Sequence, residues 1–312
     1  MNQTDTYPFP RVVRIEPASQ CNLACSHCPT GTVEMERGLM SQATFARIKT
    51  ALEQHRAEVK VVVLYHGGEP LLNKSFFDWV REIKEINPGF FVKTVSNGMA
   101  LTETAATNLL ESGIDVVEFS LDGVSADESR QVREKSDTAK IVRNINNLIA
   151  LKEARQLTKP EIFIATTQFL RSRAEKPEVN IPEWLSRAFP TGIAGFKGAL
   201  AMQWPHMGRV TKYEIVKSVG VDKNECDHVV NTITIRADGT VVPCCYDLTT
   251  KLPMGNVNES DLGEIWNSAR YIELRRSIRE KEYMSVCANC AVVRPGKYLI
   301  PKWIPISSAV AE

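Results

Sequence analysis

The sequence predicts an α/β protein whose main part is a partial (β/α)6 TIM-like barrel. Between about residues 11 and 200, short runs rich in valine and isoleucine alternate with stretches of helical periodicity. This alternation favours βα units around a parallel sheet. Polar, glycine-containing segments follow several of the runs, at the strand ends where such folds carry their chemistry. The six expected strands are Val12–Glu16, Val59–Tyr65, Phe90–Val95, Val116–Leu121, Glu161–Thr166 and about Gly192–Ala199.

The expected helices fill the intervals between these strands. The first begins after Ser41, whose residue type favours an N-cap, and includes the periodic Phe45, Ile48 and Leu52. The others are Lys74–Ile86, Glu103–Glu111, Thr138–Lys152 and Ile181–Phe189.

The pattern changes near residue 210, which we take as the boundary between two domains, 1–210 and 211–312. Asp238-Gly239 lies between two β-branched runs and predicts a hairpin with a type I′ turn. Helical sequence follows over Leu262–Lys281, and no clear element is expected from Lys297 onward. The C-terminal part is therefore expected to be a small β-hairpin with a helical extension.

Charge and hydropathy exclude broad classes of function. The 38 Lys and Arg residues against 37 Asp and Glu leave a net charge of +1, which provides no general attraction for nucleic acid or an anionic membrane. The apolar runs are strand-sized, far shorter than the roughly 20 residues of a spanning helix, and the start lacks a signal-peptide pattern. We therefore expect a cytoplasmic protein without nucleic-acid or membrane partners. In that compartment the eight cysteines indicate metal or redox chemistry rather than disulfides.

Three of the cysteines, Cys21, Cys25 and Cys28, share one short loop after the first expected strand. A structural zinc site needs four protein ligands. Three thiolates are better suited to a [4Fe–4S] cluster, in which one iron then remains without a protein ligand. The loop therefore predicts an iron–sulfur cluster that binds a further molecule at its open iron.

Three further segments follow the next expected strands in order. Gly67-Gly68-Glu69-Pro70 follows the second strand, Ser96-Asn97-Gly98 the third and Ser120-Leu121-Asp122-Gly123 the fourth. Taken singly, the last two contain ordinary turn dipeptides. Together with the cysteine loop, the segments resemble the radical S-adenosylmethionine (SAM) superfamily over about residues 11–200. The cofactor-binding residues that the resemblance implies are Gly67, Gly68, Glu69 and Pro70, Asn97, Ser120, Arg133 for the SAM carboxylate, and His27 near the adenine.

The resemblance also implies a reaction. The cluster would cleave SAM to methionine and a 5′-deoxyadenosyl radical, which abstracts hydrogen from an unactivated C–H bond. An electron donor such as flavodoxin or ferredoxin would be the protein partner. The cofactors carry this chemistry, and the protein binds and orients the substrate.

The second group of cysteines lies in the C-terminal part. Cys226, Cys244, Cys287 and Cys290 resemble the four ligands of the auxiliary [4Fe–4S] cluster in SPASM and twitch domains, and Cys245 remains without an assigned role. A four-cysteine zinc site is the alternative for the same residues. The arrangement is similar to that of twitch-domain aminocyclitol dehydrogenases, in which a fully ligated auxiliary cluster accepts an electron.

The predicted function is oxidation of a small polar substrate, such as an alcohol, sugar or aminocyclitol. The candidates for handling the hydroxyl proton are Asp247, His206 and Arg209, and Trp204 is a candidate for the pocket wall. The alternatives are a radical SAM peptide or protein maturase, an epimerase that uses Cys245, and a non-catalytic metal-binding or redox-sensing protein.

Overall fold

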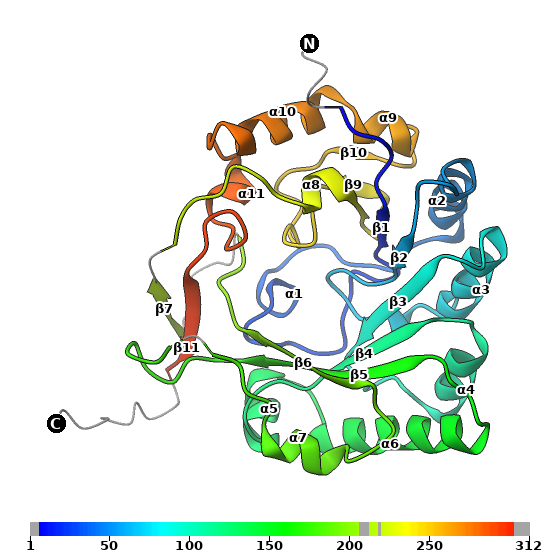
Figure 1. Cartoon of the computed structure of the whole chain (residues 1–312), viewed down its shortest axis with the longest axis vertical. Helices are drawn as coiled ribbons and strands as arrows, with labels where there is room; N and C mark the ends of the chain where they lie inside the picture. Colours follow the sequence, from blue (N-terminus) through cyan, green and yellow to red (C-terminus); the bar gives the residue numbers. More distant parts are fainter. Residues whose placement is uncertain (1–5, 177, 206–211, 218–219, 303–312) are drawn as a thin grey trace.

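The computed structural model describes residues 6–302 except 177, 206–211 and 218–219 (Figure 1). One nine-stranded sheet dominates it, with the strand order β10-β9-β8-β1-β2-β3-β4-β5-β6. From β8 through β6 every neighbouring pair is parallel. The first six strands confirm the expected α/β class: β1 (Val12–Ile15), β2 (Val61–Val63), β3 (Phe91–Ser96), β4 (Val116–Ser120), β5 (Glu161–Gln168) and β6 (Gly195–Leu200).

Helices cover the outer face of the curved sheet (Figure 1). In α2 (Gln42–Gln54), the Ser41 hydroxyl accepts a hydrogen bond from Thr44 N, as its N-cap pattern predicts. The outer residues of the strands are apolar and pack against these helices, whereas several inner residues are polar. The other helices of this part are α1 (Pro29–Thr32), a 3₁₀ turn at Pro70–Leu72, α3 (Phe76–Ile86), α4 (Glu103–Glu111), α5 (Ala126–Val132), α6 (Thr138–Ala154) and α7 (Glu183–Ala188).

The predicted hairpin is present, and it continues the barrel sheet. Its first strand, β8 (Thr232–Ile235), pairs in parallel with β1, and β9 (Thr240–Val242) and β10 (Gly255–Asn256) follow as antiparallel neighbours. The expected type I′ turn is wrong. Gly239 has φ +86°, whereas Asp238 is not among the residues with positive φ, and Gly239 N donates to Arg236 O at 2.9 Å. This is the geometry of a longer loop that ends in one left-handed residue.

The C-terminal elements differ from the expectation in two places. Helical sequence over Leu262–Lys281 forms two helices, α9 (Leu262–Trp266) and α10 (Ala269–Arg279), because the chain breaks at Asn267 and Ser268. A strand that the sequence did not predict, β11 (Lys297–Pro301), pairs antiparallel with β7 (Tyr213–Lys217). The remaining helices are α8 (His228–Asn231) and α11 (Ser285–Ala288). Within the described residues, every helix is too short or too polar to cross a membrane.

Candidate functional site

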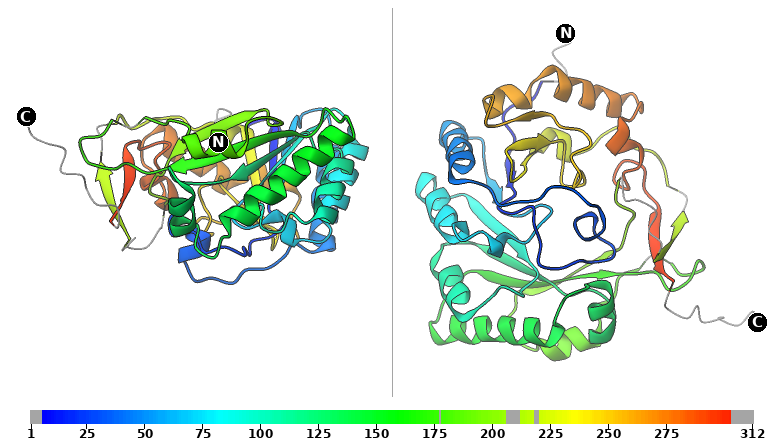
Figure 2. Two further views of the ribbon diagram at one scale, coloured as in Figure 1. Left: turned by 90° about the horizontal axis from the view of Figure 1, so that it is seen from below. Right: turned by 180° about the vertical axis from the view of Figure 1, so that it is seen from behind.

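The three N-terminal cysteines lie on the connection between β1 and α2, which covers one end of the barrel (Figure 2). Backbone bonds fix this loop: Ala24 N donates to Glu134 O and Ser26 N to Val132 O, both at 2.9 Å. Helix α1 packs directly on the loop, since a Cβ on Gly31 would lie 2.6 Å from the Cys25 carbonyl oxygen. All three cysteine residues are half-buried.

The surroundings of these thiols fit an anionic cluster. Burial raises the pKa of Cys25 to about 12, and the charge of Arg133 opposes that rise. The Arg133 side chain is buried, and its Nε has no hydrogen-bond partner. Leu23 N donates to Cys21 Sγ at 3.4 Å, the kind of N–H···S contact that stabilises cluster thiolates. The loop therefore combines three half-buried cysteines with a buried cation and an N–H donor.

Asp122 joins two of the predicted SAM-binding residues. Its Oδ2 accepts from Arg133 Nη1 at 2.7 Å and lies 3.4 Å from His27 Nε2. Burial alone would raise the pKa of the Asp122 carboxyl. The charge of Arg133, and after it His27, hold this pKa well below its usual range. Asp122 thus orients both side chains at the edge of the cysteine loop.

The backbone of the Gly67–Pro70 segment packs directly against the backbone of residues 18–20, just before the cysteine loop. A Cβ on Gly68 would lie 2.2 Å from Ala18 O, so only glycine fits there. The Glu69 carboxylate accepts hydrogen bonds from Leu71 N, Ser96 Oγ and Asn97 N at 2.7–3.1 Å. In this structure Glu69 therefore ties the end of β2 to the end of β3.

The remaining predicted cofactor contacts also lie at strand ends. Asn97 Nδ2 donates to Asn22 Oδ1 at 2.7 Å and lies 3.7 Å from Cys21 Sγ. Ser120 is the last residue of β4 and is half-buried, and Pro70 opens the 3₁₀ turn. The structure thus brings the loop and the three strand-end segments to one end of the sheet.

The auxiliary cysteines gather beside the hairpin. Cys244, Cys287 and Cys290 are buried and Cys226 is half-buried. Burial raises the pKa of Cys287 to about 12, and the neighbouring Cys290 and Cys226 add to the rise. Among the described residues, no three His, Cys, Asp or Glu side chains are placed to hold one metal ion.

Of the three residues predicted to handle the hydroxyl proton, the structure describes one, Asp247. Both carboxylate oxygens of Asp247 accept backbone N–H groups, from Lys251 and from Leu252, each at 2.9 Å. Asp247 is buried, and these bonds shape the turn that follows Cys245. His206 and Arg209 lie outside the described residues.

A cavity of about 260 Å³ lies between the two groups of cysteines. On one side it is lined by His27 and Cys28 of the N-terminal loop, and on the other by Tyr246, next to Cys245. Trp204, whose ring centroid is 5.2 Å from that of Tyr246, also lines this cavity. Residues 199–203 and Thr167 form the remaining lining.

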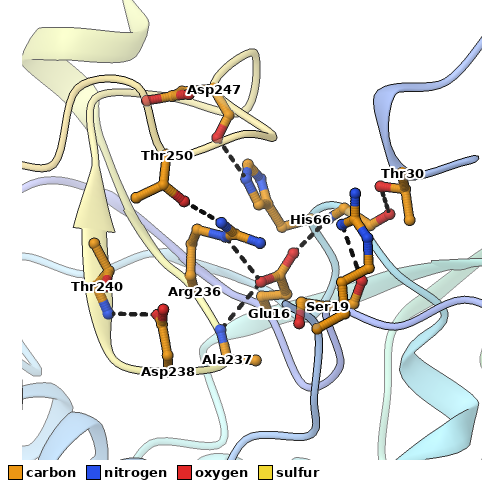
Figure 3. A network of polar contacts seen from close by, with 12 residues as sticks. Glu16, Ser19, Thr30, His66, Arg236, Ala237, Asp238, Thr240, Asp247 and Thr250 are labelled. Atoms are coloured by element: carbon orange, nitrogen blue, oxygen red, sulfur yellow. Dashed lines mark hydrogen bonds and ion pairs between the residues drawn. The ribbon is translucent and has the colours of Figure 1, made fainter. Parts of the chain in front are cut away.

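Glu16 connects the cysteine-loop end of the barrel to the hairpin (Figure 3). Its carboxylate is fully buried and accepts from Gly67 N at 2.8 Å and Ala237 N at 3.1 Å. Arg236 Nε lies 3.3 Å from Glu16 Oε2. One buried carboxylate therefore contacts both the Gly67–Pro70 segment and the turn of the hairpin.

His66, in the same network, predicts a pH dependence of stability. Desolvation lowers its pKa to about 3, and the charges of Arg14 and Arg236 act in the same direction. Because the unfolded imidazole has a pKa of about 6.5, stability is complete above that pH and decreases as the pH falls towards 3. At pH 5.5 we expect a loss of about 1.4 kcal/mol relative to pH 7.5. Urea denaturation should show this loss in the wild type and not in His66→Gln; an equal pH dependence in both would contradict the assignment.

Comparison with known proteins agrees with this geometry. Residues 15–157 match the model of the radical SAM superfamily, and residues 226–291 match the SPASM iron–sulfur cluster-binding domain. The chain therefore contains a radical SAM domain, followed by a C-terminal SPASM region. It is a radical SAM enzyme whose cofactors are SAM, a SAM-binding [4Fe–4S] cluster and auxiliary iron–sulfur.

Two curated proteins and one solved structure are similar to most of the chain. The chain is 27% identical to the tungsten-containing aldehyde ferredoxin oxidoreductase cofactor-modifying protein of Pyrococcus furiosus, over 89% of this chain and 86% of that protein. It is 22% identical to the S-adenosyl-L-methionine-dependent 2-deoxy-scyllo-inosamine dehydrogenase of Niallia circulans, over 89% and 92%. The crystal structure of BtrN in complex with AdoMet and 2-DOIA superposes with a TM-score of 0.58 at 17% identity and covers 91% of this chain and 94% of BtrN. The similarity to the BtrN structure shows that the two chains share a fold.

Proposed function

We propose that the protein is a radical SAM dehydrogenase that oxidises a small polar alcohol. The observation that carries the proposal is the cavity between Cys28 and Tyr246, which lies between the two groups of thiols. Its volume of about 260 Å³ is below the usual range of ligand pockets and suits one small molecule. The full-length similarity to a dehydrogenase from Niallia circulans supports the same reaction type.

In this proposal the two cysteine groups hold separate clusters. Cys21, Cys25 and Cys28 ligate the SAM-binding cluster, and Cys226, Cys244, Cys287 and Cys290 ligate the auxiliary one. In the same proposal Arg133, which donates a hydrogen bond to Asp122, binds the SAM carboxylate, and the backbone of Gly67–Pro70 binds the SAM ammonium. Glu69 holds that backbone in place through its three hydrogen bonds.

When bound, SAM and the clusters supply a hydrogen-abstracting radical and a one-electron acceptor. The chain contributes a cavity that holds the carbinol carbon between them. Oxidation of the alcohol would require these groups to take up the C–H hydrogen and one electron, and the hydroxyl proton would pass to water at the cavity wall, several of whose residues are exposed or half-buried. A flavodoxin or ferredoxin would supply the electron that starts each turnover, in a cytoplasmic setting.

The test uses deuterium at the carbinol carbon. The anaerobically reconstituted enzyme is incubated with SAM, a reductant and a panel of carbinol-deuterated sugars and cyclitols, and 5′-deoxyadenosine is analysed by mass spectrometry. We expect deuterium in 5′-deoxyadenosine together with a carbonyl product. A deuterated peptide panel run in parallel tests the maturase alternative. Transfer from a peptide and from none of the alcohols would contradict the proposal.

A further inference from the structure

One wall of the cavity between the two groups of cysteines carries two aromatic rings, Trp204 and Tyr246, which we call the aromatic corner. Their centroids lie 5.2 Å apart, and the two ring planes are inclined at 42° to each other. Tyr246 also makes an edge-on contact with the ring of His228, at a centroid distance of 5.7 Å. The other side of the cavity, with His27 and Cys28, belongs to the cysteine loop. In the proposed function that side faces the SAM-binding cluster, which leaves the aromatic corner to the substrate.

Backbone hydrogen bonds to β11 fix the segment that leads to Trp204. Leu299 N donates to Ala201 O at 3.0 Å. Two residues further along the segment, Gln203 N donates to Lys297 O at 3.1 Å. This wall of the cavity is therefore formed before a ligand binds, and a preformed wall loses less conformational entropy on binding.

Polar side chains without partners surround the aromatic corner. Within the described part of the chain, the Tyr246 hydroxyl, the Trp204 indole N–H and the Gln203 amide make no hydrogen bond, and neither does the hydroxyl of the cavity-lining Thr167. A hydroxyl and an amide can each donate and accept, whereas an indole only donates. A ligand that covers such groups must supply their partners, because an unsatisfied buried polar group costs free energy. These four groups therefore favour a ligand with several hydroxyl groups over one with a single hydroxyl.

The lining also bears on the charge of the ligand. None of the described residues that line the cavity is Asp, Glu, Lys or Arg. Apolar side chains complete the wall, from Ala199, Leu200, Ala201 and Met202. A charged group that leaves water for such surroundings loses its hydration and gains no counter-charge, which is costly. The cavity therefore favours an uncharged ligand over an acid or an amine.

We propose that the substrate is an uncharged cyclic polyol, a neutral sugar or cyclitol, whose apolar ring face stacks on the aromatic corner. Tryptophan and tyrosine suit this role because each combines a large apolar face with a polar tip. Hydrogen bonds from Tyr246, Gln203 and Thr167 orient the hydroxyl groups, in keeping with ligand pockets in which a few polar groups on an apolar wall fix the orientation. The inference rests on the proposed dehydrogenase function, and it narrows the substrate class to exclude sugar acids, sugar phosphates and aminocyclitols.

The experiment measures binding rather than turnover. Isothermal titration of the reconstituted enzyme with SAM, without reductant, compares three neutral cyclic polyols, myo-inositol, glucose and galactose, with four probes that each lack one property. Glucuronate and glucosamine are charged, sorbitol has no ring, and benzyl alcohol has a ring but a single hydroxyl. We expect at least one neutral cyclic polyol to bind at least tenfold more tightly than each of these four probes.

Variants assign the binding to the aromatic corner and its polar groups. Trp204→Leu removes the stacking ring and should weaken binding of the neutral polyol about tenfold or more. Tyr246→Phe keeps the ring but removes the hydroxyl, and Gln203→Leu removes the amide; each should weaken binding several-fold. The matched controls are Phe91→Leu, at a side chain 42% exposed at the start of β3, and Gln54→Leu, at an exposed position at the end of α2. Both controls should leave binding unchanged, and an unchanged iron content shows that each variant is folded.

Three results would overturn the inference: binding of any of the four comparison probes within tenfold of the best neutral cyclic polyol, no measurable binding of any neutral cyclic polyol, or no effect of both Trp204→Leu and Tyr246→Phe. Failure of the proposed function gives a different result. In that case the neutral polyols bind, and the variants weaken their binding as expected, yet no alcohol transfers deuterium to 5′-deoxyadenosine. Deuterium transfer from a charged alcohol and from none of the neutral ones would contradict the inference while the dehydrogenase function stands.

Discussion

Replacing Cys25 by serine is expected to abolish formation of 5′-deoxyadenosine from SAM. Three cysteines leave one iron of the cluster open for SAM, and two do not hold the cluster. The iron content should fall from about eight to about four per chain, because the auxiliary cluster remains. Iron analysis and quantification of 5′-deoxyadenosine after reduction check both results. Normal SAM cleavage by the variant would contradict the ligand assignment.

Two matched substitutions separate the roles of the other cysteines. Cys290→Ser should also lose about four irons per chain but retain SAM cleavage, while formation of the oxidised product fails. Cys245→Ala should keep the full iron content and form product, because Cys245 has no ligand role in our assignment. An epimerase that used Cys245 as a hydrogen donor would stall in this variant.

Replacing Glu16 by alanine is expected to lower the free energy of unfolding by about 3–5 kcal/mol. The substitution leaves the Arg236 guanidinium, 3% exposed, without its buried anionic partner. It also removes the acceptor of the Gly67 and Ala237 N–H groups. Urea denaturation of the anaerobic protein measures the change.

The control for this substitution is Glu36→Ala. Glu36 is exposed and has no ion-pair partner among the described residues, so we expect a change below about 0.5 kcal/mol. A loss of less than about 1 kcal/mol in Glu16→Ala would show that Glu16 does not join the barrel to the hairpin as the contacts indicate.

Much of the fold could be predicted because its signals are local. The strands β1 to β5 each contain several β-branched residues, and the N-cap at Ser41 lies within one helical turn of its partner. The pairing of β8 with β1 and of β11 with β7 could not be predicted, because these partners are more than 75 residues apart in the chain. The type of the turn at Gly239 could not be predicted correctly, because the length of the loop depends on which residues of β8 and β9 pair.

In the candidate site, too, local patterns could be predicted and long-range contacts could not. The spacing of the cysteines and the motifs after the strands are evident in the sequence, and the structure brings them to one end of the sheet. The sequence shows Asp122 only as part of a motif, because its ion pair with Arg133, 11 residues away, forms only in the fold. Glu16 shows no signal in the sequence beyond a charged residue at the end of a β-branched run. Its role becomes visible only when the fold brings Gly67 and Ala237 to its carboxylate.

The most direct test of the dehydrogenase account is the stoichiometry of one turnover. With the deuterated alcohol that the panel identifies, we expect SAM consumed, deuterated 5′-deoxyadenosine formed and carbonyl product formed in equal molar amounts. A carbonyl product formed without consumption of SAM, or 5′-deoxyadenosine formed with an alcohol that is not oxidised, would contradict the account.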